Sequence, residues 1–243
     1  MRIFTGTSGF SYPAWKGSFY PVDLPSKQML AYYARRLATV EANATFYRMP
    51  RPETLAGWRS QVAPGFVFAL KAPQRVTHVK RLAGAGDLLA AFHRAAAELG
   101  AALGPVLYQL PPSLAKDVPR LADFLESLPA GGRAAFATLA EHGAALCIAD
   151  TEEATTPAVA TAPFGYLRLR RAAYDGAALR GWADRILAER WAEAFVYFKH
   201  EDEARGPAFA LAMSDIVSAR GAAPHDAPGG ASAEMLTAPR SGC

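Results

Sequence analysis

The segment Phe66-Val-Phe-Ala-Leu-Lys71 alternates large apolar side chains with others and ends on a charge. A period of two is typical of a β-strand whose two faces meet different surroundings. An alanine-rich stretch that opens at Asp87 predicts a helix after it, and 104–110 predicts the next strand. A strand, a crossover helix and a second strand in this order predict a parallel βαβ unit.

The same alternation continues from this unit toward both ends of the 243 residues. Helices are expected between the strands from start signals such as Ser26 and the Pro52-Glu53 pair. Eight such units predict an α/β fold of the TIM type, a (β/α)8 barrel, with an open doubly wound sheet as the alternative. The expected strands are 2–8, 39–45, 66–71, 104–110, 133–136, 145–150, 165–170 and 194–200.

Two regions depart from this regular pattern. Only residues 137–144 separate the fifth and sixth expected strands, whereas a helical crossover needs roughly ten to twelve residues, so we expect a truncated fifth βα unit. After Val217 the chain is rich in Ala, Gly, Pro and Ser. We therefore predict one barrel domain over 1–217 and a disordered tail over 218–243.

Composition limits the classes of partner. The 26 basic residues nearly match the 22 acidic ones and leave a net charge of +4. The basic residues are spread along the chain, apart from Arg168–Arg171. This distribution favours a small anionic ligand over nucleic acid. The first residues lack a signal-peptide pattern and no long apolar run occurs, so we expect a cytoplasmic protein without a membrane span. No Gly-rich phosphate loop, Rossmann fingerprint or metal-type Cys spacing occurs, so we expect neither a cofactor nor a metal.

Strand alternation predicts which polar side chains point into the barrel. The apolar residues beside Glu41, for example, suit the helix side, so Glu41 itself should face inward. Active sites of such barrels lie at the C-terminal ends of the strands, where most of these polar residues fall. The expected ligand-binding set is Thr7, Asn43, Thr45, Lys71, Gln109, Arg168, Arg170 and Lys199, with Glu41, Asp150 and His78 as candidate acids or bases.

The charges of this set are unbalanced. Four cations (Lys71, Arg168, Arg170 and Lys199) against two anions (Glu41 and Asp150) leave an excess of two positive charges. Because unpaired buried charges are unfavourable, we expect a phosphate or carboxylate ligand, which arginine binds well. The alternative is that the pairs Glu41–Arg168 and Asp150–Arg170 are structural.

Three further patterns have two interpretations each. His78 is either a general acid or base or a surface histidine. The triplet His200-Glu201-Asp202 resembles metal ligands, but consecutive residues rarely converge on one ion. The aromatic residues within 10–20 either stack on a base or sugar or cap the barrel mouth.

The ordered motifs resemble domain-of-unknown-function family 72, the YecE-like proteins. The resemblance spans about residues 1–215 and implies a TIM-barrel-like fold without implying an activity. It rests on Gly6-Thr-Ser-Gly-Phe-Ser-Tyr-Pro-Ala-Trp-Lys-Gly-Ser-Phe-Tyr-Pro21, Val40-Glu-Ala-Asn-Ala-Thr-Phe-Tyr-Arg48, 66–71 with Thr77-His78, Leu107-Tyr-Gln-Leu-Pro-Pro112, 166–170 and 196–201.

The chain also departs from the family's pattern. Family members usually carry a polar fifth-strand segment with Glu, Arg and His, whereas here Arg133-Ala-Ala-Phe136 runs straight into 137–143. Many members have His-Gly where this chain has Arg170-Arg171. These departures imply the loss of candidate pocket residues.

Three functions remain open at this point. The first is an enzyme acting on a small phosphorylated or carboxylated substrate, with Glu41 or Asp150 as acid or base. The second is a nucleic-acid-binding or nucleic-acid-processing protein, which the basic balance and the aromatic loop would support. The third is a non-catalytic ligand-binding barrel, which the missing segment favours.

Overall fold

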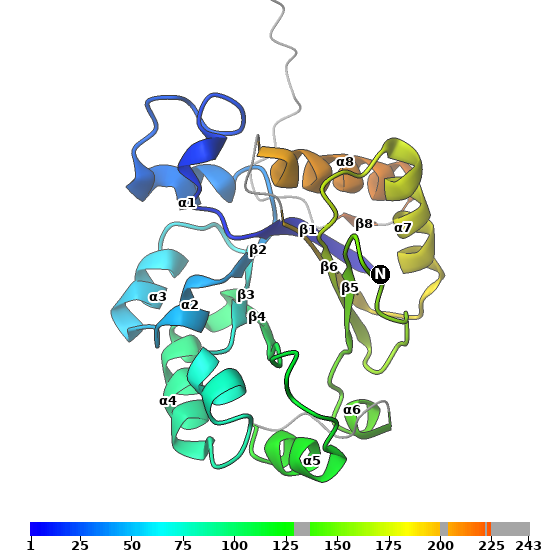
Figure 1. Cartoon of the computed structure of the whole chain (residues 1–243). Coiled ribbons are helices and arrows are strands. Elements are labelled where there is room, and N and C mark those ends of the chain that lie inside the picture. The colour runs from blue at the N-terminus through cyan, green and yellow to red at the C-terminus, as the bar shows by residue number, and fades with distance from the viewer. Residues whose placement is uncertain (129–136, 200–203, 222, 225–243) are drawn as a thin grey trace, which may run out of the picture.

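The computed structural model describes residues 1–128, 137–199, 204–221 and 223–224. Seven parallel strands form one sheet in the order β4-β3-β2-β1-β7-β6-β5, curled into a TIM-barrel-like half-barrel with helices on its outer face (Figure 1). The strands are β1 Arg2–Ser8, β2 Thr39–Ala42, β3 Val67–Lys71, β4 Leu103–Leu107, β5 Cys147–Asp150, β6 Phe164–Leu169 and β7 Glu193–Phe198.

Helices connect successive strands except β5 and β6, which follow each other without a helix in the described residues between them. Asp117 and Asp175 cap α5 and α7 by accepting hydrogen bonds from the amides of Arg120 and Ala178, which explains where these helices begin. None of the helices in the described ranges is long and apolar enough to cross a bilayer. The α-helices are α1 Met29–Tyr33, α2 Ala44–Tyr47, α3 Pro52–Arg59, α4 Gly86–Ala96, α5 Val118–Glu126, α6 Ala137–Glu141, α7 Gly176–Ala188 and α8 Arg205–Ala219, and short turns of other helices are η1 Pro13–Trp15, η2 Ser26–Gln28, η3 Arg75–Val79 and η4 Ala97–Ala102.

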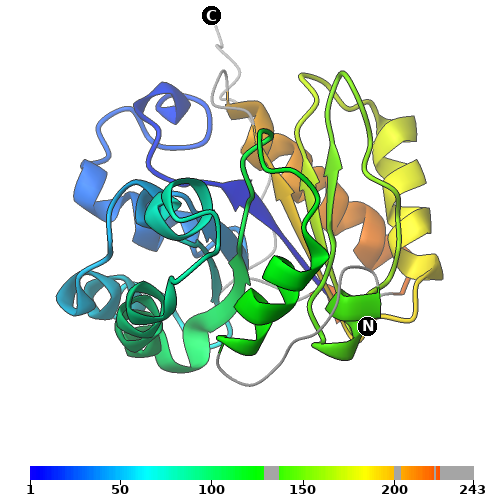
Figure 2. The same ribbon diagram turned by 60° about the horizontal axis from the view of Figure 1, so that its bottom comes forward.

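The sheet is open where the closed barrel was expected to continue. Over the described residues β4 and β5 are the two edges of the sheet, and α5 and α6 lie across the opening between them (Figures 1 and 2). The expected strand 133–136 lies outside the described residues. The eight-stranded closure is therefore replaced, in the part described, by a half-barrel.

Two element boundaries also differ from expectation. The strand predicted over 39–45 ends at Ala42, because α2 begins at Ala44. At the other end of the chain, α8 continues to Ala219 and β8, Ala223–Pro224, pairs in parallel with the start of β1. The predicted domain end at 217 thus falls inside α8, while 222 and 225–243 lie outside the described residues.

The alternation predicted the outward faces of the apolar strand residues, but Thr7 and Asp150, which were expected to face inward, also lie on the outer face. Val40, Leu167 and Val196 point outward into the main core beneath the helices. Inside the curl, the rings of Phe4 and Phe195 stack with centroids 4.8 Å apart. The interior near the N-terminal ends of the strands is therefore apolar, and the polar side chains lie toward the C-terminal ends.

The aromatic residues of the first loop are part of the core. Trp15, Phe19 and Tyr20 are buried and pack against one another and against α1. They offer no open ring face to a base or sugar, so the structure argues against stacking on a ligand for these three residues.

Candidate functional site

A buried ion pair forms the centre of the candidate site. Glu41 on β2 and Arg168 on β6 both face inward, and Arg168 Nη2 donates to Glu41 Oε1 at 2.9 Å. The Tyr166 hydroxyl donates to Glu41 Oε2 at 2.7 Å, and Ser8 Oγ donates to Oε1. Glu41 is fully buried and Arg168 is 6% exposed. The carboxylate therefore has a partner on each oxygen and fixes the position of the guanidinium.

Two amide side chains extend this network. Arg168 Nη1 donates to Gln109 Oε1 at 3.0 Å, and Asn43 Nδ2 donates to Ser8 Oγ at 2.9 Å. The Nε of Arg168 is buried and finds no acceptor among the described residues. A buried donor without an acceptor is unfavourable, so this N–H is available to donate to an acceptor from outside the chain.

Three more cations surround the pair. Burial, together with the positive charges of Arg168, Arg170 and Lys199, lowers the pKa of Lys71 to about 8 against the opposing charge of Glu41. Burial and the neighbouring Arg168 also lower the pKa of Arg170. Lys71, Arg168 and Arg170 against the carboxylate of Glu41 leave an excess of two positive charges among these four residues. A bound anion would relieve this repulsion.

The Lys71 ammonium also contacts an aromatic ring. Its Nζ lies 4.1 Å from the centroid of the Phe46 ring, within cation–π range. The ring of His78 packs edge-on against the same Phe46 ring at 5.0 Å, and its Nδ1 lies 2.9 Å from Thr77 Oγ1. Burial and the charge of Lys71 lower the pKa of His78, so its ring is neutral at pH 7. The structure thus places His78 at the edge of the cationic cluster.

Two predicted ligand-binding residues have other contacts. Thr7 points to the outer face, where its Oγ1 lies 2.9 Å from the Tyr33 hydroxyl. Thr45 lies on α2 rather than on a strand, and its Oγ1 donates to the Lys71 carbonyl at 2.7 Å. Strand alternation misplaced both, Thr7 by its face and Thr45 because the strand ends earlier.

Asp150 belongs to a separate cluster on the outer face. Its carboxylate accepts from Arg171 Nη2 at 2.8 Å, from Tyr174 at 2.9 Å and from Thr155 at 2.6 Å. Burial raises the pKa of Asp150, but these hydrogen bonds outweigh it and hold the pKa below its usual value. The expected pair with Arg170 is replaced by a pair with Arg171, so Asp150 does not belong to the cationic set.

Residues that the strand pattern did not single out complete the site. Ser8 shares its face with Phe4, and counting from Phe4 rather than Thr5 would have placed it inward. Tyr166 was expected to face inward but was not given a role beside Glu41. Cys147 is the register partner of Tyr166. In each case the alternation in the sequence indicates the face on which the residue lies, but it does not indicate the hydrogen-bond partner.

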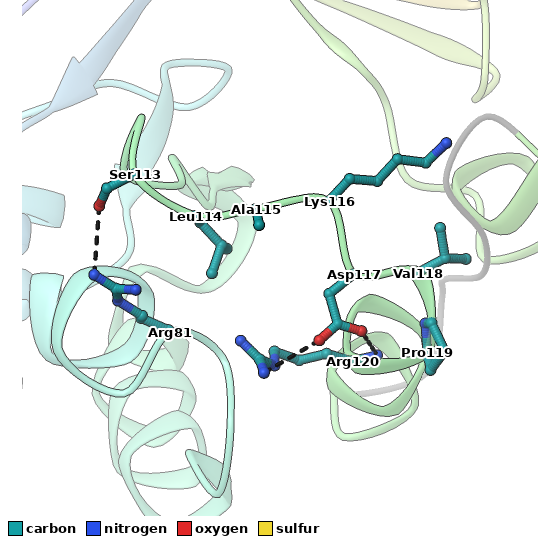
Figure 3. A pocket seen from close by; sticks show the side chains of 9 residues that line it. All are labelled: Arg81, Ser113, Leu114, Ala115, Lys116, Asp117, Val118, Pro119 and Arg120. Carbon is teal, nitrogen blue, oxygen red and sulfur yellow. Dashed lines mark hydrogen bonds and ion pairs between the residues drawn. The ribbon is translucent and has the colours of Figure 1, made fainter.

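A hollow lies outside this cluster, where the loop after β4 enters α5. It measures about 470 Å³, and Figure 3 shows Arg81 reaching Ser113 on one side and the Asp117–Arg120 pair on the other. Asp117 already accepts from the first turn of α5, so this helix start presents a carboxylate rather than a free anion site. Within the described residues no group of three His, Cys, Asp or Glu side chains is placed to hold a metal. The triplet 200–202 lies outside them.

Comparisons with known proteins agree with this architecture. The UPF0759 protein YecE of Escherichia coli K12 is 33% identical over 128 residues, which are 52% of this chain and 44% of that protein. The chain thus matches less than half the length of this curated relative.

Two solved structures share the fold. A DUF72 family protein from Thermotoga maritima superposes with a TM-score of 0.76 at 24% identity, over 90% of this chain and 100% of that one. A DUF72 family protein from Enterococcus faecalis gives 0.66 at 18% identity, over 89% and 98%. The family model described as "Protein of unknown function DUF72" matches residues 4–232, and the chain therefore belongs to the DUF72 family.

Proposed function

We propose that the protein binds a small anionic ligand, a phosphate or carboxylate, at the C-terminal ends of its strands. The observation that carries this proposal is the cluster of Lys71, Arg168 and Arg170 around one carboxylate, with Arg168 Nε buried and without an acceptor among the described residues. Arginine and lysine are the residues that bind phosphate and carboxylate groups in proteins.

The proposed roles follow from the contacts. Glu41 acts as a positioning residue, because its oxygens are engaged by Arg168, Tyr166 and Ser8. Lys71 and Arg170 are half-buried and can contact the ligand directly. An acid–base step by the neutral His78 on that ligand stays a prediction.

The shape of the site favours a small ligand over a nucleic acid. Arg168 lies within the curl of the sheet, whereas a duplex is bound by exposed basic side chains along one face.

We also propose that the fifth βα unit is truncated, which leaves the wall of the site open between β4 and β5.

Isothermal titration of the full chain with inorganic phosphate tests the proposal. We expect saturable binding that weakens about tenfold in Arg170→Gln, since a charged hydrogen bond is worth about 1.5–3 kcal/mol. Arg190→Gln is the matched control, because Arg190 is exposed and precedes β7, at the opposite end of the strands. Equal affinity in both variants, or no binding by the unmodified chain to phosphate or to acetate, would overturn the proposal.

A further inference from the structure

A cavity of about 590 Å³ lies in the opening between β4 and β5. Its walls are the apolar side chains of β4, α5, α6 and the start of β5, among them Leu107, Phe124, Leu125 and Leu139. Protein interiors are close-packed and contain few voids larger than a water molecule. A hollow of this size is instead in the range of small-molecule binding sites.

One residue of the cavity wall also belongs to the hydrogen-bond network of the ion pair. Tyr166 lines the cavity, and its hydroxyl donates to Glu41. Leu110, also in the wall and 38% exposed, follows Gln109, which accepts from Arg168. The ion pair is therefore one hydrogen bond away from a residue of the cavity wall.

The thiol beside Tyr166 keeps this wall apolar. Cys147 lines the cavity, and burial raises the pKa of its thiol to about 12, which the charge of Arg168 only partly offsets. The thiol is therefore protonated at neutral pH and behaves as a small apolar group. The charges of Arg168 and Glu41 act on the pKa of this thiol in opposite directions.

We infer that the ligand is amphipathic, with its anionic group on the cationic cluster and a hydrocarbon or aromatic body in the cavity. The inference rests on the proposed function, since it assigns the apolar part of the same ligand. Apolar groups that leave water for this cavity would add affinity that the anion alone lacks. The ligand class is therefore an alkyl or aryl phosphate or carboxylate rather than a free sugar phosphate.

A series of inorganic, butyl and octyl phosphate, each below its micelle concentration, tests the inference by isothermal titration of the full chain. Each methylene that becomes buried should strengthen binding by about fourfold. We expect octyl phosphate to bind about 100-fold tighter than inorganic phosphate, since only part of the chain is fully buried.

Filling the cavity should remove this advantage. Ala145 is partly buried on the cavity side of the chain entering β5, so Ala145→Phe should reduce the octyl preference to below tenfold and leave inorganic phosphate binding unchanged. Leu121→Phe, from α5, fills the same cavity from the other wall if the first variant does not fold. Ala177→Phe on the exposed start of α7 is the matched control.

The outcomes separate the two proposals. If inorganic and octyl phosphate bind equally, or if the octyl preference survives both filling variants, the apolar part lies elsewhere and the inference fails while the proposed function stands. If neither ligand binds the unmodified chain, the cationic cluster does not bind phosphate and both fail. A preference lost only in the filling variants supports both.

Discussion

At the scale of single residues, the pair of Glu41 and Arg168 dominates the interior. Both side chains are buried, so removing one charge leaves the other without its partner in a poorly solvated place. We expect Glu41→Gln to lower the free energy of unfolding by about 3–5 kcal/mol in urea denaturation. The control is Arg2→Gln, which breaks the Arg2–Glu193 pair, where the Arg2 side chain is 60% exposed, and should cost less than about 1 kcal/mol. Equal losses of unfolding free energy in the two variants would show that burial does not determine how much the Glu41–Arg168 pair contributes to stability.

Lys71 gives the site a pH dependence in the alkaline range. Its pKa lies near 8 because burial and the neighbouring cations disfavour its charge. As pH rises through 8 the ammonium loses its proton, so anion binding should weaken between about pH 7.5 and 9.5, although a bound anion shifts this pKa upward. In Lys71→Met, phosphate binding should be weaker at pH 7.5 and nearly flat across the same range. Titration calorimetry at four pH values measures this, and an unchanged slope in the variant would contradict it.

At the scale of elements, the close contact of β1 with β2 depends on Gly6. Its register partner is Thr39, and a Cβ at Gly6 would overlap the Thr39 carbonyl oxygen. Gly6→Ala must push the strands apart, so we expect a loss of about 1–3 kcal/mol in the free energy of unfolding. Gly57→Ala on α3 is the matched control: its Cβ meets no atom within 4 Å, and alanine should stabilise the helix by about 0.5–1 kcal/mol. A Gly6→Ala variant as stable as the unmodified protein would show that the strands can shift freely.

At the scale of the whole molecule, stability should be uneven around the half-barrel. Strand β1 is paired on both sides by β2 and β7, whereas β4 and β5 are edges over the described residues. Beside these edges lies the apolar cavity, which removes packing contacts from the wall. We expect the amides of β4 and β5 to exchange faster than those of β1 and β7, because local opening follows low contact density.

Hydrogen exchange followed by mass spectrometry measures this difference. Octyl phosphate should slow exchange in β4 and β5 if it fills the cavity, since a ligand stabilises the state that binds it. Uniform protection across all seven strands without ligand would contradict an open wall.

The sequence by itself predicted the parallel strands from their alternation with helices, and the inward faces of Glu41 and Arg168 from the alternation along each strand. Arg168 faces inward since Leu167 and Leu169 need the core, and that requirement is visible in the sequence. The positions of Thr7 and Thr45 were predicted less well. Thr45 followed the same alternation, but the strand had already ended at Ala42, and strand ends are set by pairing with neighbours.

Only the tertiary structure decided which charges meet. Asp150 pairs with Arg171 rather than Arg170, because the chain turns after β6 and Tyr174 folds back onto the carboxylate. The opening between β4 and β5 and the cavity beside it also depend on segments far apart in sequence. Local periodicity carries no information on such distances, and therefore the pocket could not be read from the sequence.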